Sequence, residues 1–347
     1  MRAGEPSPTL IASTPRAGIP RTTRSGSDWS AELRGVVRNV GELLAMLEVA
    51  PADLDVDVDS KFALRVPRSF VRRMKLGDPA DPLLRQVLPL AAESVRVAGF
   101  SRDPLQEHGT SVAPAVIQKY AGRVLLIAAA ECAVHCRYCF RRNFPYSEHR
   151  LSVGEDSLNA VRNDPSISEV IASGGDPLML TDGHFFRLLG ALEAIEHVQR
   201  LRIHTRLPVV IPSRITLALA DRLGASRLGV VLVLHVNHAN EIDAELVARV
   251  AELCDAGVTV LNQSVLLSGV NDDITSLVTL SEQLFAARIL PYYLHLLDLV
   301  EGAHHFLVQD ARARELYAGM RVRLPGYLVP RLARETPGQP AKDWLLG

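Results

Sequence analysis

The chain has 347 residues, of which 48% are apolar and 22% are charged, and this composition excludes an intrinsically disordered protein. Its 38 basic and 39 acidic residues leave a net charge of −1, so no overall positive field indicates direct binding to nucleic acid. No apolar run reaches the roughly 20 residues that span a bilayer. We therefore expect a cytoplasmic protein without a membrane segment.

Residues 1–28 are rich in Pro, Ser, Thr and Arg and lack the apolar core of a secretory signal. We interpret them as a flexible tail, with a transit peptide or an early start codon as alternatives. Residues 29–113 show mainly helical patterns, and helices are expected to begin near Ser30 and Val40. This stretch is predicted to form an N-terminal helical region.

From residue 114 onward, short runs of Val, Ile and Leu alternate with amphipathic stretches of helical length, as in parallel βα units. The alternation predicts an α/β fold, either a partial (β/α)6 barrel over 114–325 or an open α/β sheet. In both folds the chemistry gathers at the C-terminal ends of the strands. The predicted strands are 123–130, 167–173, 200–204, 229–236, 257–262 and 289–296. The predicted helices are 152–163, 183–196, 215–225, 240–255, 272–287 and 310–321.

Three of the four cysteines, Cys132, Cys136 and Cys139, follow the first predicted strand of the barrel. Disulfides are not expected in a chain of this size with four cysteines and no signal peptide. A zinc site would need a fourth ligand, either His135 or Cys254, whereas three thiolates suit a [4Fe–4S] cluster with one iron open. Cys254 itself is interpreted as a buried apolar filler on a helix.

The spacing Cys-x-x-x-Cys-x-x-Cys, with Tyr138 before the third cysteine, resembles the radical S-adenosylmethionine (SAM) enzymes. In these enzymes the open iron binds the methionine end of SAM. The resemblance extends to a Gly-Gly-Asp-Pro turn after the second strand, which is otherwise only a turn signal. It implies that this turn lets the backbone approach SAM closely, through Gly174, Gly175 and Asp176.

Several longer segments resemble the lysine 2,3-aminomutase family within that superfamily, and the likeness covers about residue 60 to the C-terminus. The segments are 136–142, 204–216, 237–241, 262–267 and 291–295. Residues 61–70 are typical of the branch that makes (R)-β-lysine for modification of elongation factor P. The resemblance implies a partial (β/α)6 barrel of the radical SAM type. It also implies an isomerase that converts L-α-lysine to (R)-β-lysine with a [4Fe–4S] cluster, SAM and pyridoxal 5′-phosphate (PLP).

An amine can form a Schiff base and a guanidinium cannot, yet only four of the 38 basic residues are lysines. The resemblance implies that Lys342, in the C-terminal segment 326–347, binds PLP covalently. It also implies that Lys119, Tyr120 and Arg123 bind the PLP phosphate, with a solvated strand entry as the alternative. The chain departs from the family directly after Lys342, where it reads Asp-Trp instead of Thr-Pro.

The same resemblance assigns the two ends of the substrate. Arg141 matches the residue that binds the substrate carboxylate, whereas Arg142 beside it is expected to face solvent. Asp298 and Glu335 match acidic residues that receive the ε-ammonium of lysine, and both being acidic favours a diamino acid. Ordinary surface acidity is the alternative for these two.

His235 and Gln263 match positions that contact the carboxylate of SAM or nearby atoms. A polar pair satisfied within the core is the alternative. The expected partners are L-lysine, an electron donor such as a flavodoxin and, through the pathway, an elongation factor P β-lysine ligase. A homo-oligomer stays open.

Three other functions remain as alternatives at this point. The enzyme could act on free lysine in catabolism, although catabolic relatives extend further at the C-terminus, or it could act on another amino acid. A third reading is a non-catalytic iron–sulfur electron carrier, which would have no use for an open iron or a PLP lysine.

Overall fold

The computed structural model describes residues 28–144 and 153–345. The predicted tail over 1–28 therefore lies, apart from Asp28, outside the described residues. Within the described part no helix is both long and apolar enough to cross a membrane.

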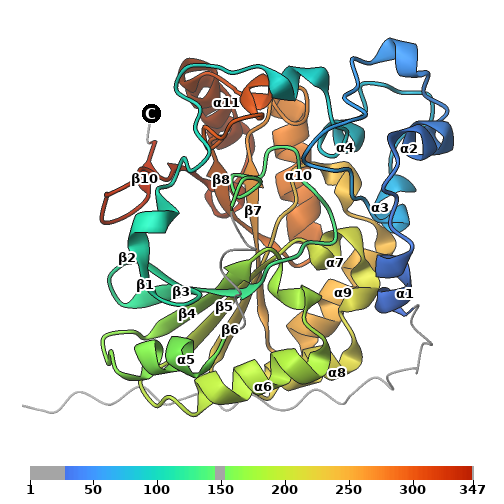
Figure 1. Cartoon of the computed structure of the whole chain (residues 1–347). Coiled ribbons are helices and arrows are strands. Elements are labelled where there is room, and N and C mark those ends of the chain that lie inside the picture. Colours follow the sequence, from blue (N-terminus) through green and yellow to red (C-terminus); the bar gives the residue numbers. More distant parts are fainter. Residues whose placement is uncertain (1–27, 145–152, 346–347) are drawn as a thin grey trace, which may run out of the picture.

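A single ten-stranded sheet organises the molecule, and its strands follow one another in sequence order from β1 to β10 (Figure 1). Strands β3 to β9 are parallel, whereas β1, β2 and β10 run antiparallel to their neighbours. The strands are β1 (Ser111–Ala113), β2 (Val116–Tyr120), β3 (Arg123–Ala129), β4 (Glu169–Gly174), β5 (Arg200–Thr205), β6 (Gly229–Leu234), β7 (Thr259–Val265), β8 (Leu290–His295), β9 (Arg331–Arg334) and β10 (Asp343–Trp344).

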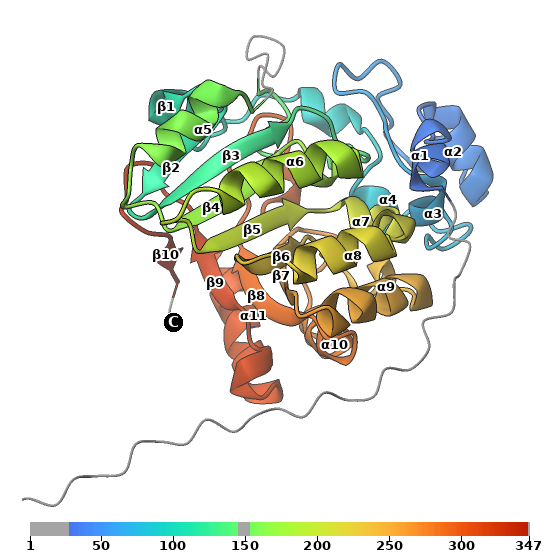
Figure 2. The same cartoon turned by 90° about the horizontal axis from the view of Figure 1, so that it is seen from below.

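Helices follow the parallel strands and cover the outer face of the sheet, as Figure 2 shows for α5, α6, α8 and α9. The six predicted βα units are confirmed, and they form a partial (β/α)6 barrel whose edges are β1 and β10. The helices are α1 (Trp29–Arg34), α2 (Val40–Leu47), α3 (Arg68–Val71), α4 (Pro82–Arg85), α5 (Glu155–Arg162), α6 (Asp182–Glu193), α7 (Leu207–Val210), α8 (Leu217–Gly224), α9 (Ala244–Asp255), α10 (Ile274–Ala286) and α11 (Asp310–Arg323).

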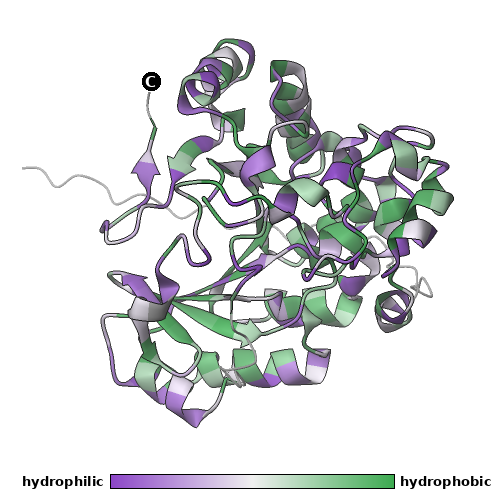
Figure 3. Cartoon of the chain, turned by 45° about the horizontal axis from the view of Figure 1, so that its top comes forward, coloured by the Kyte–Doolittle hydropathy of each residue, from purple (hydrophilic) through white to green (hydrophobic). Residues whose placement is uncertain are grey.

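Local sequence explains where the barrel helices begin. Thr181, Thr216, Asp243 and Asp273 precede α6, α8, α9 and α10, and each side chain accepts a hydrogen bond from a backbone N–H of the first turn. Such caps satisfy donors that a helix leaves unpaired and stabilise it by about 1 kcal/mol each. Apolar faces of the helices then pack on the sheet, which Figure 3 shows as a hydrophobic interior with mixed outer helices.

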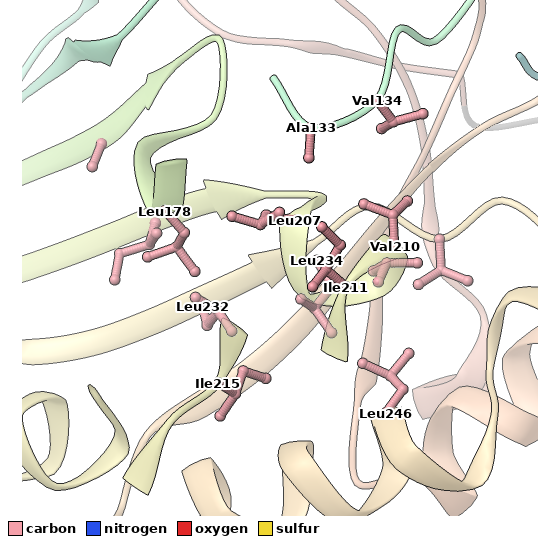
Figure 4. Close-up of a cluster of buried hydrophobic side chains, with 14 of the residues drawn as sticks. Ala133, Val134, Leu178, Leu207, Val210, Ile211, Ile215, Leu232, Leu234 and Leu246 are labelled. Atoms are coloured by element: carbon pink, nitrogen blue, oxygen red, sulfur yellow. The ribbon is translucent and has the colours of Figure 1, made fainter. Parts of the chain in front are cut away.

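The N-terminal helical region shares its core with the barrel. Leu43, Leu83 and Leu126 belong to one cluster of buried side chains, although they come from α2, α4 and β3. Figure 4 shows another part of this cluster, where α7 packs beside Leu232 and Leu234 of β6. The residues before β1 therefore brace the barrel directly instead of forming a separate hydrophobic core.

Candidate active site

A cavity of about 530 Å³ lies at the C-terminal ends of the barrel strands, where Gly174, Thr205 and His295 line it. All fifteen residues that the sequence singled out as site residues line this one cavity. They are Cys132, Cys136, Cys139, Gly174, Gly175, Asp176, His235, Gln263, Lys119, Tyr120, Arg123, Arg141, Asp298, Glu335 and Lys342.

The three clustered cysteines lie on the loop after β3, which is held against the N-terminal region. The backbone N–H of His135 donates to the Arg65 carbonyl, and that of Arg137 donates to the Gln86 carbonyl, both at 2.9 Å.

Burial raises the pKa of Cys139 to about 11. Metal binding to this loop must therefore release protons from thiols, as thiolates are the ligands. In the described part of the chain, no three His, Cys, Asp or Glu side chains are grouped as ligands of a metal ion.

The two residues considered as a fourth zinc ligand lie elsewhere. The ring of His135 stacks on Phe62, and its Nδ1 is 2.8 Å from the carbonyl oxygen of Ala63. Cys254 lies on α9, with its sulfur 3.7 Å from the Arg288 carbonyl, and is half-buried rather than fully buried. Neither lines the cavity, so the structure brings neither side chain to the three cysteines.

The glycine turn after β4 is packed tightly against the start of the cysteine loop. Gly174 has φ +120°, and a Cβ on it would lie 2.4 Å from the Ala129 carbonyl oxygen. A Cβ on Gly175 would lie 2.4 Å from the carbonyl oxygen of Glu131. The two glycines are therefore required by backbone packing, independently of the predicted approach to SAM.

Asp176 ties the same turn to the end of β5. Its carboxylate accepts hydrogen bonds from the Thr205 hydroxyl at 2.7 Å and from the backbone N–H groups of Arg206 and Leu207 at 2.8 Å. Burial raises the pKa of this carboxyl. Asp176 thus positions backbone at two strand ends, and a direct contact with SAM stays a prediction.

His235 pairs with the aromatic residue of the cysteine motif. Its Nε2 lies 2.9 Å from the Tyr138 hydroxyl, and the two rings stack at 5.6 Å. Burial holds the pKa of His235 well below its ordinary value, so the ring is neutral. This contact agrees with the alternative of a satisfied polar group in the core. Gln263 lies on β7 and lines the cavity.

Five side chains of alternating charge lie next to one another in the cavity wall, in the order Arg141, Glu107, Lys119, Glu335 and Lys342. We call them the charge chain. Arg141 donates to both carboxylate oxygens of Glu107, with Nε–Oε2 at 2.7 Å and Nη2–Oε1 at 2.8 Å. Lys119 lies 3.2 Å from Glu107 and 2.8 Å from Glu335, and Lys342 donates to the other oxygen of Glu335. The predicted sites for the substrate carboxylate, the phosphate and the PLP lysine are thus adjacent.

The two acidic residues assigned to the substrate ammonium differ in charge. Burial alone would raise the pKa of Glu335, but Lys342 and Lys119 outweigh it and hold that pKa at about 2. Burial raises the pKa of Asp298 to about 7, and the nearby charge of Glu335 adds to the effect. Both lie in the cavity wall, which excludes the alternative of ordinary surface acidity.

The C-terminal hairpin explains how Asp-Trp is accommodated after Lys342. Asp343 and Trp344 form β10, and Trp344 pairs with Ala333 of β9. The Thr336 hydroxyl donates to Asp343 at 2.5 Å, and the guanidinium of Arg331 lies 4.7 Å from the Trp344 ring. The residues that depart from the family pattern therefore close the hairpin that carries Lys342.

The residues assigned to the phosphate lie at the end of β2 and the start of β3, on the two sides of the turn that joins these strands. Tyr120 pairs with Arg123 across the turn, and the Arg123 guanidinium lies 4.8 Å from the Tyr120 ring. Burial raises the pKa of Tyr120 to about 12, with the charge of Glu335 adding to the effect, so the hydroxyl keeps its proton and can donate a hydrogen bond. Two cations and a hydroxyl in one cavity wall are suited to a phosphate.

The expectation that Arg142 faces solvent is wrong. Its Nη2 lies 2.5 Å from Glu93, and its Nη1 donates to the Gly302 carbonyl at 3.0 Å. Glu93 also binds Arg137, with Nε–Oε1 at 2.7 Å. A buried carboxylate from the N-terminal region thus fixes two arginines of the cysteine loop, and desolvation makes such contacts costly to break.

Sequence reasoning missed two buried charged residues that line the cavity, Glu107 and Arg206. It also missed Glu93, which binds two arginines of the cysteine loop. Arg206 stands in the segment 204–216 that carries the family resemblance, but the pattern of residues there indicates no role for it. The two glutamates lie in short 3-10 helices without a motif. Their arginine partners are 34 or more residues distant in sequence, so nothing in the local pattern could have identified them.

Comparisons with known proteins place these features in context. The chain is 50% identical to L-lysine 2,3-aminomutase of Escherichia coli over 325 residues, covering 92% of this chain and 95% of that one. It is 46% identical to the Haemophilus influenzae protein of the same name, covering 92% and 96%. A third relative of that name, from Clostridium subterminale, is 33% identical and covers 90% and 76%.

No family model matches the chain. Among solved structures, a radical SAM methyltransferase from Sphaerobacter thermophilus aligns with a TM-score of 0.47 at 17% identity, covering 63% of this chain and 68% of that one.

Proposed function

The chain belongs to the lysine 2,3-aminomutase family of radical SAM isomerases, and we propose that it makes (R)-β-lysine from L-α-lysine for modification of elongation factor P. The observation that carries the aminomutase activity is the convergence of all fifteen candidate residues on one cavity. The typical segment at 61–70 supports the assignment to elongation factor P. Membership of this family decides against the non-catalytic electron carrier.

The residues present fit the family's cofactors, a [4Fe–4S] cluster, SAM and PLP. Three thiols from one loop line the same cavity, which suits a cluster with an open iron. Lys342 is the amine that would hold PLP, and Lys119, Tyr120 and Arg123 are the donors that would hold its phosphate. When bound, these groups supply the radical that removes a substrate hydrogen and the π-system that delocalises the unpaired electron.

The protein's own task is to hold lysine by both ends. Arg141 would bind the carboxylate, because its guanidinium is buried in the cavity wall beside the cysteine loop. Asp298 and Glu335 would bind the ε-ammonium at the other end. Two fixed ends orient one C–H bond, and a buried site excludes water and stray hydrogen donors.

Arg141 and Glu335 already bind other members of the charge chain. We infer that lysine binding rearranges these contacts: the substrate carboxylate shares Arg141 with Glu107, and the substrate ammonium takes part of the Glu335 carboxylate. An exchange of one ion pair for another costs less than stripping a buried charge of its only partner.

The direct test uses protein reconstituted anaerobically with iron, sulfide, PLP and SAM and supplied with a reductant such as dithionite. L-lysine should be converted to β-lysine, and chiral amino-acid analysis should identify the R enantiomer. Unchanged lysine from protein with a full cluster would contradict the proposal. The same assay with other amino acids tests the alternative substrates.

A second experiment addresses the pathway. In a host that lacks its own lysine 2,3-aminomutase, this chain should restore β-lysylated elongation factor P, as detected by mass spectrometry. Restored β-lysine without modified elongation factor P would instead favour the free-lysine catabolic role. The electron donor, the ligase and any homo-oligomer are further proposals that follow from this role.

A further inference from the structure

A guanidinium lies beside one of the three clustered cysteines. Arg206 directly follows β5 and is buried, and its Nη1 lies 3.0 Å from the sulfur of Cys136. The same nitrogen contacts the hydroxyl of Tyr138, which belongs to the cysteine motif. None of the roles proposed above for substrate, PLP or SAM uses this arginine.

The position of Arg206 is built by several buried groups. Its Nη2 donates to Gln86 at 2.8 Å and to Glu241 at 3.1 Å. Glu241 is fully buried and is itself fixed by the backbone N–H of Asn237 at 2.9 Å. The backbone N–H of Arg206 is held by Asp176 of the glycine turn. Both the side chain and the backbone of this residue are thus set in place before any cofactor binds.

We propose that Arg206 raises the reduction potential of the cluster on Cys132, Cys136 and Cys139, by donating a hydrogen bond to the Cys136 thiolate and by its positive charge. The proposal rests on the cluster assignment made above. In this role Arg206 is not a ligand of the cluster, and it changes the reduction potential through the Cys136 sulfur.

The direction follows from charge. Reduction adds one electron to the cluster, taken from an external reductant, with no other bond made or broken. Hydrogen bonds to the sulfurs and nearby charge are established controls of such potentials. A donor on the sulfur and a cation beside it favour the more negative, reduced state, and a buried site strengthens both effects.

The guanidinium keeps its positive charge, because arginine is not deprotonated in proteins. The carboxylate of Glu241 lies 3.1 Å from it. This carboxylate offsets part of the positive charge that the cluster experiences. Removing that carboxylate should therefore act in the opposite direction to removing Arg206.

Because the two substitutions should shift the reduction potential in opposite directions, the sign of each shift tests the inference. The midpoint potential of the reconstituted cluster is measured by an EPR-monitored redox titration of the full chain. Arg206→Met should shift the potential to more negative values, and Glu241→Gln should shift it to more positive values. Arg206→Lys, which retains the charge, should lie between the unmodified chain and Arg206→Met.

The matched control is Arg222→Gln. This substitution removes an arginine from an ion pair with Glu193 on α6, which lies outside the cavity lining, and it should leave the potential unchanged. Iron and sulfide content are measured for every variant. If Arg206→Met fails to load a cluster, Glu241→Gln still carries the test through the sign of its shift.

Two results would overturn the inference: potentials that do not move in fully loaded variants, or Arg206→Met and Glu241→Gln shifting in the same direction. A shift in one direction is what a merely structural disturbance of the site would produce. Failure of the unmodified chain to load iron or to convert lysine would instead contradict the proposed function. The two failures are therefore distinguishable.

Discussion

Lys342 donates a hydrogen bond to Glu335 within the hairpin that joins β9 to β10. This contact orders the amine next to the phosphate-binding candidates, because Lys119 binds the other oxygen of the same carboxylate at 2.8 Å. The lysine proposed to bind PLP is therefore held by an acidic neighbour, and an arginine in its place could keep this ion pair.

Lys342→Arg should abolish the PLP linkage while keeping the ion pair with Glu335. Arginine keeps the charge but cannot form a Schiff base, so borohydride reduction should trap PLP on the unmodified chain and not on this variant. Mass spectrometry of the reduced protein measures the outcome. Lys75→Arg, at an exposed pair with Asp78, is the control that should retain PLP. Trapped PLP on Lys342→Arg would show that another lysine binds it.

Lysine binding should depend on pH through Asp298. Its pKa is raised from 3.8 to about 7, so below pH 7 the carboxyl of the ligand-free protein is mostly protonated and neutral. The substrate ammonium favours the ionised form, and affinity should therefore fall as pH falls below about 7, by up to about tenfold per pH unit. Calorimetric titration with lysine between about pH 8.5 and 5.5 measures this.

Asp298→Asn should remove most of that pH dependence and weaken binding at high pH. The control is Asp310→Asn, which changes a carboxylate on α11 that pairs with Arg334 outside the cavity. This control should keep the unmodified pH profile. An Asp298→Asn profile that follows the unmodified chain would exclude Asp298 as the group responsible.

Glu107→Ala should destabilise the fold by about 3–5 kcal/mol, because it leaves the buried Arg141 and the half-buried Lys119 without this carboxylate. Urea unfolding followed by circular dichroism measures the loss. Glu155→Ala removes an exposed partner of Arg162 on α5, and it should change the free energy of unfolding by less than about 1 kcal/mol. Equal effects of the two substitutions would contradict the role assigned to Glu107.

Gly174→Ala should be strongly destabilising. The new Cβ would lie 2.4 Å from the Ala129 carbonyl oxygen and 2.9 Å from Ile127, at a φ that suits glycine. Overpacking and backbone strain of this kind cost on the order of 1–3 kcal/mol each. Gly190→Ala is the control, because nothing lies within 4 Å of its Cβ position and it is inside α6. This change should stabilise the protein by up to about 1 kcal/mol in thermal unfolding.

The six parallel strands β3 to β8 were predictable from sequence because short apolar runs alternate with stretches of helical length, whereas the parallel strand β9 was not predicted. Runs such as Arg123–Ala129 and Gly229–Leu234 are almost continuously apolar, and capped helices separate them. The antiparallel edges were missed for a physical reason. β1 has three residues and β10 has two, too few for any period to appear, and their pairing depends on distant partners.

The fifteen candidate site residues were identified largely through the family resemblance, whereas the ion pairs that hold several of them were not. Arg142 illustrates the limit, because adjacent arginines look solvent-exposed in sequence until a buried glutamate from another region pairs with one of them. Burial of a charge depends on a partner far along the chain, and local pattern carries no information about that partner.

Because β10 is short, the C-terminal hairpin should open locally at a lower free energy than the cysteine loop. β10 is two residues long, so few backbone hydrogen bonds retain the hairpin that presents Lys342, whereas the cysteine loop is anchored by buried charges. Segments with few such bonds open at a lower free energy than the rest of a protein. We expect faster amide exchange in 335–345 than in 131–142. Small molecules would then enter beside Lys342 without exposing the iron–sulfur end to oxidants.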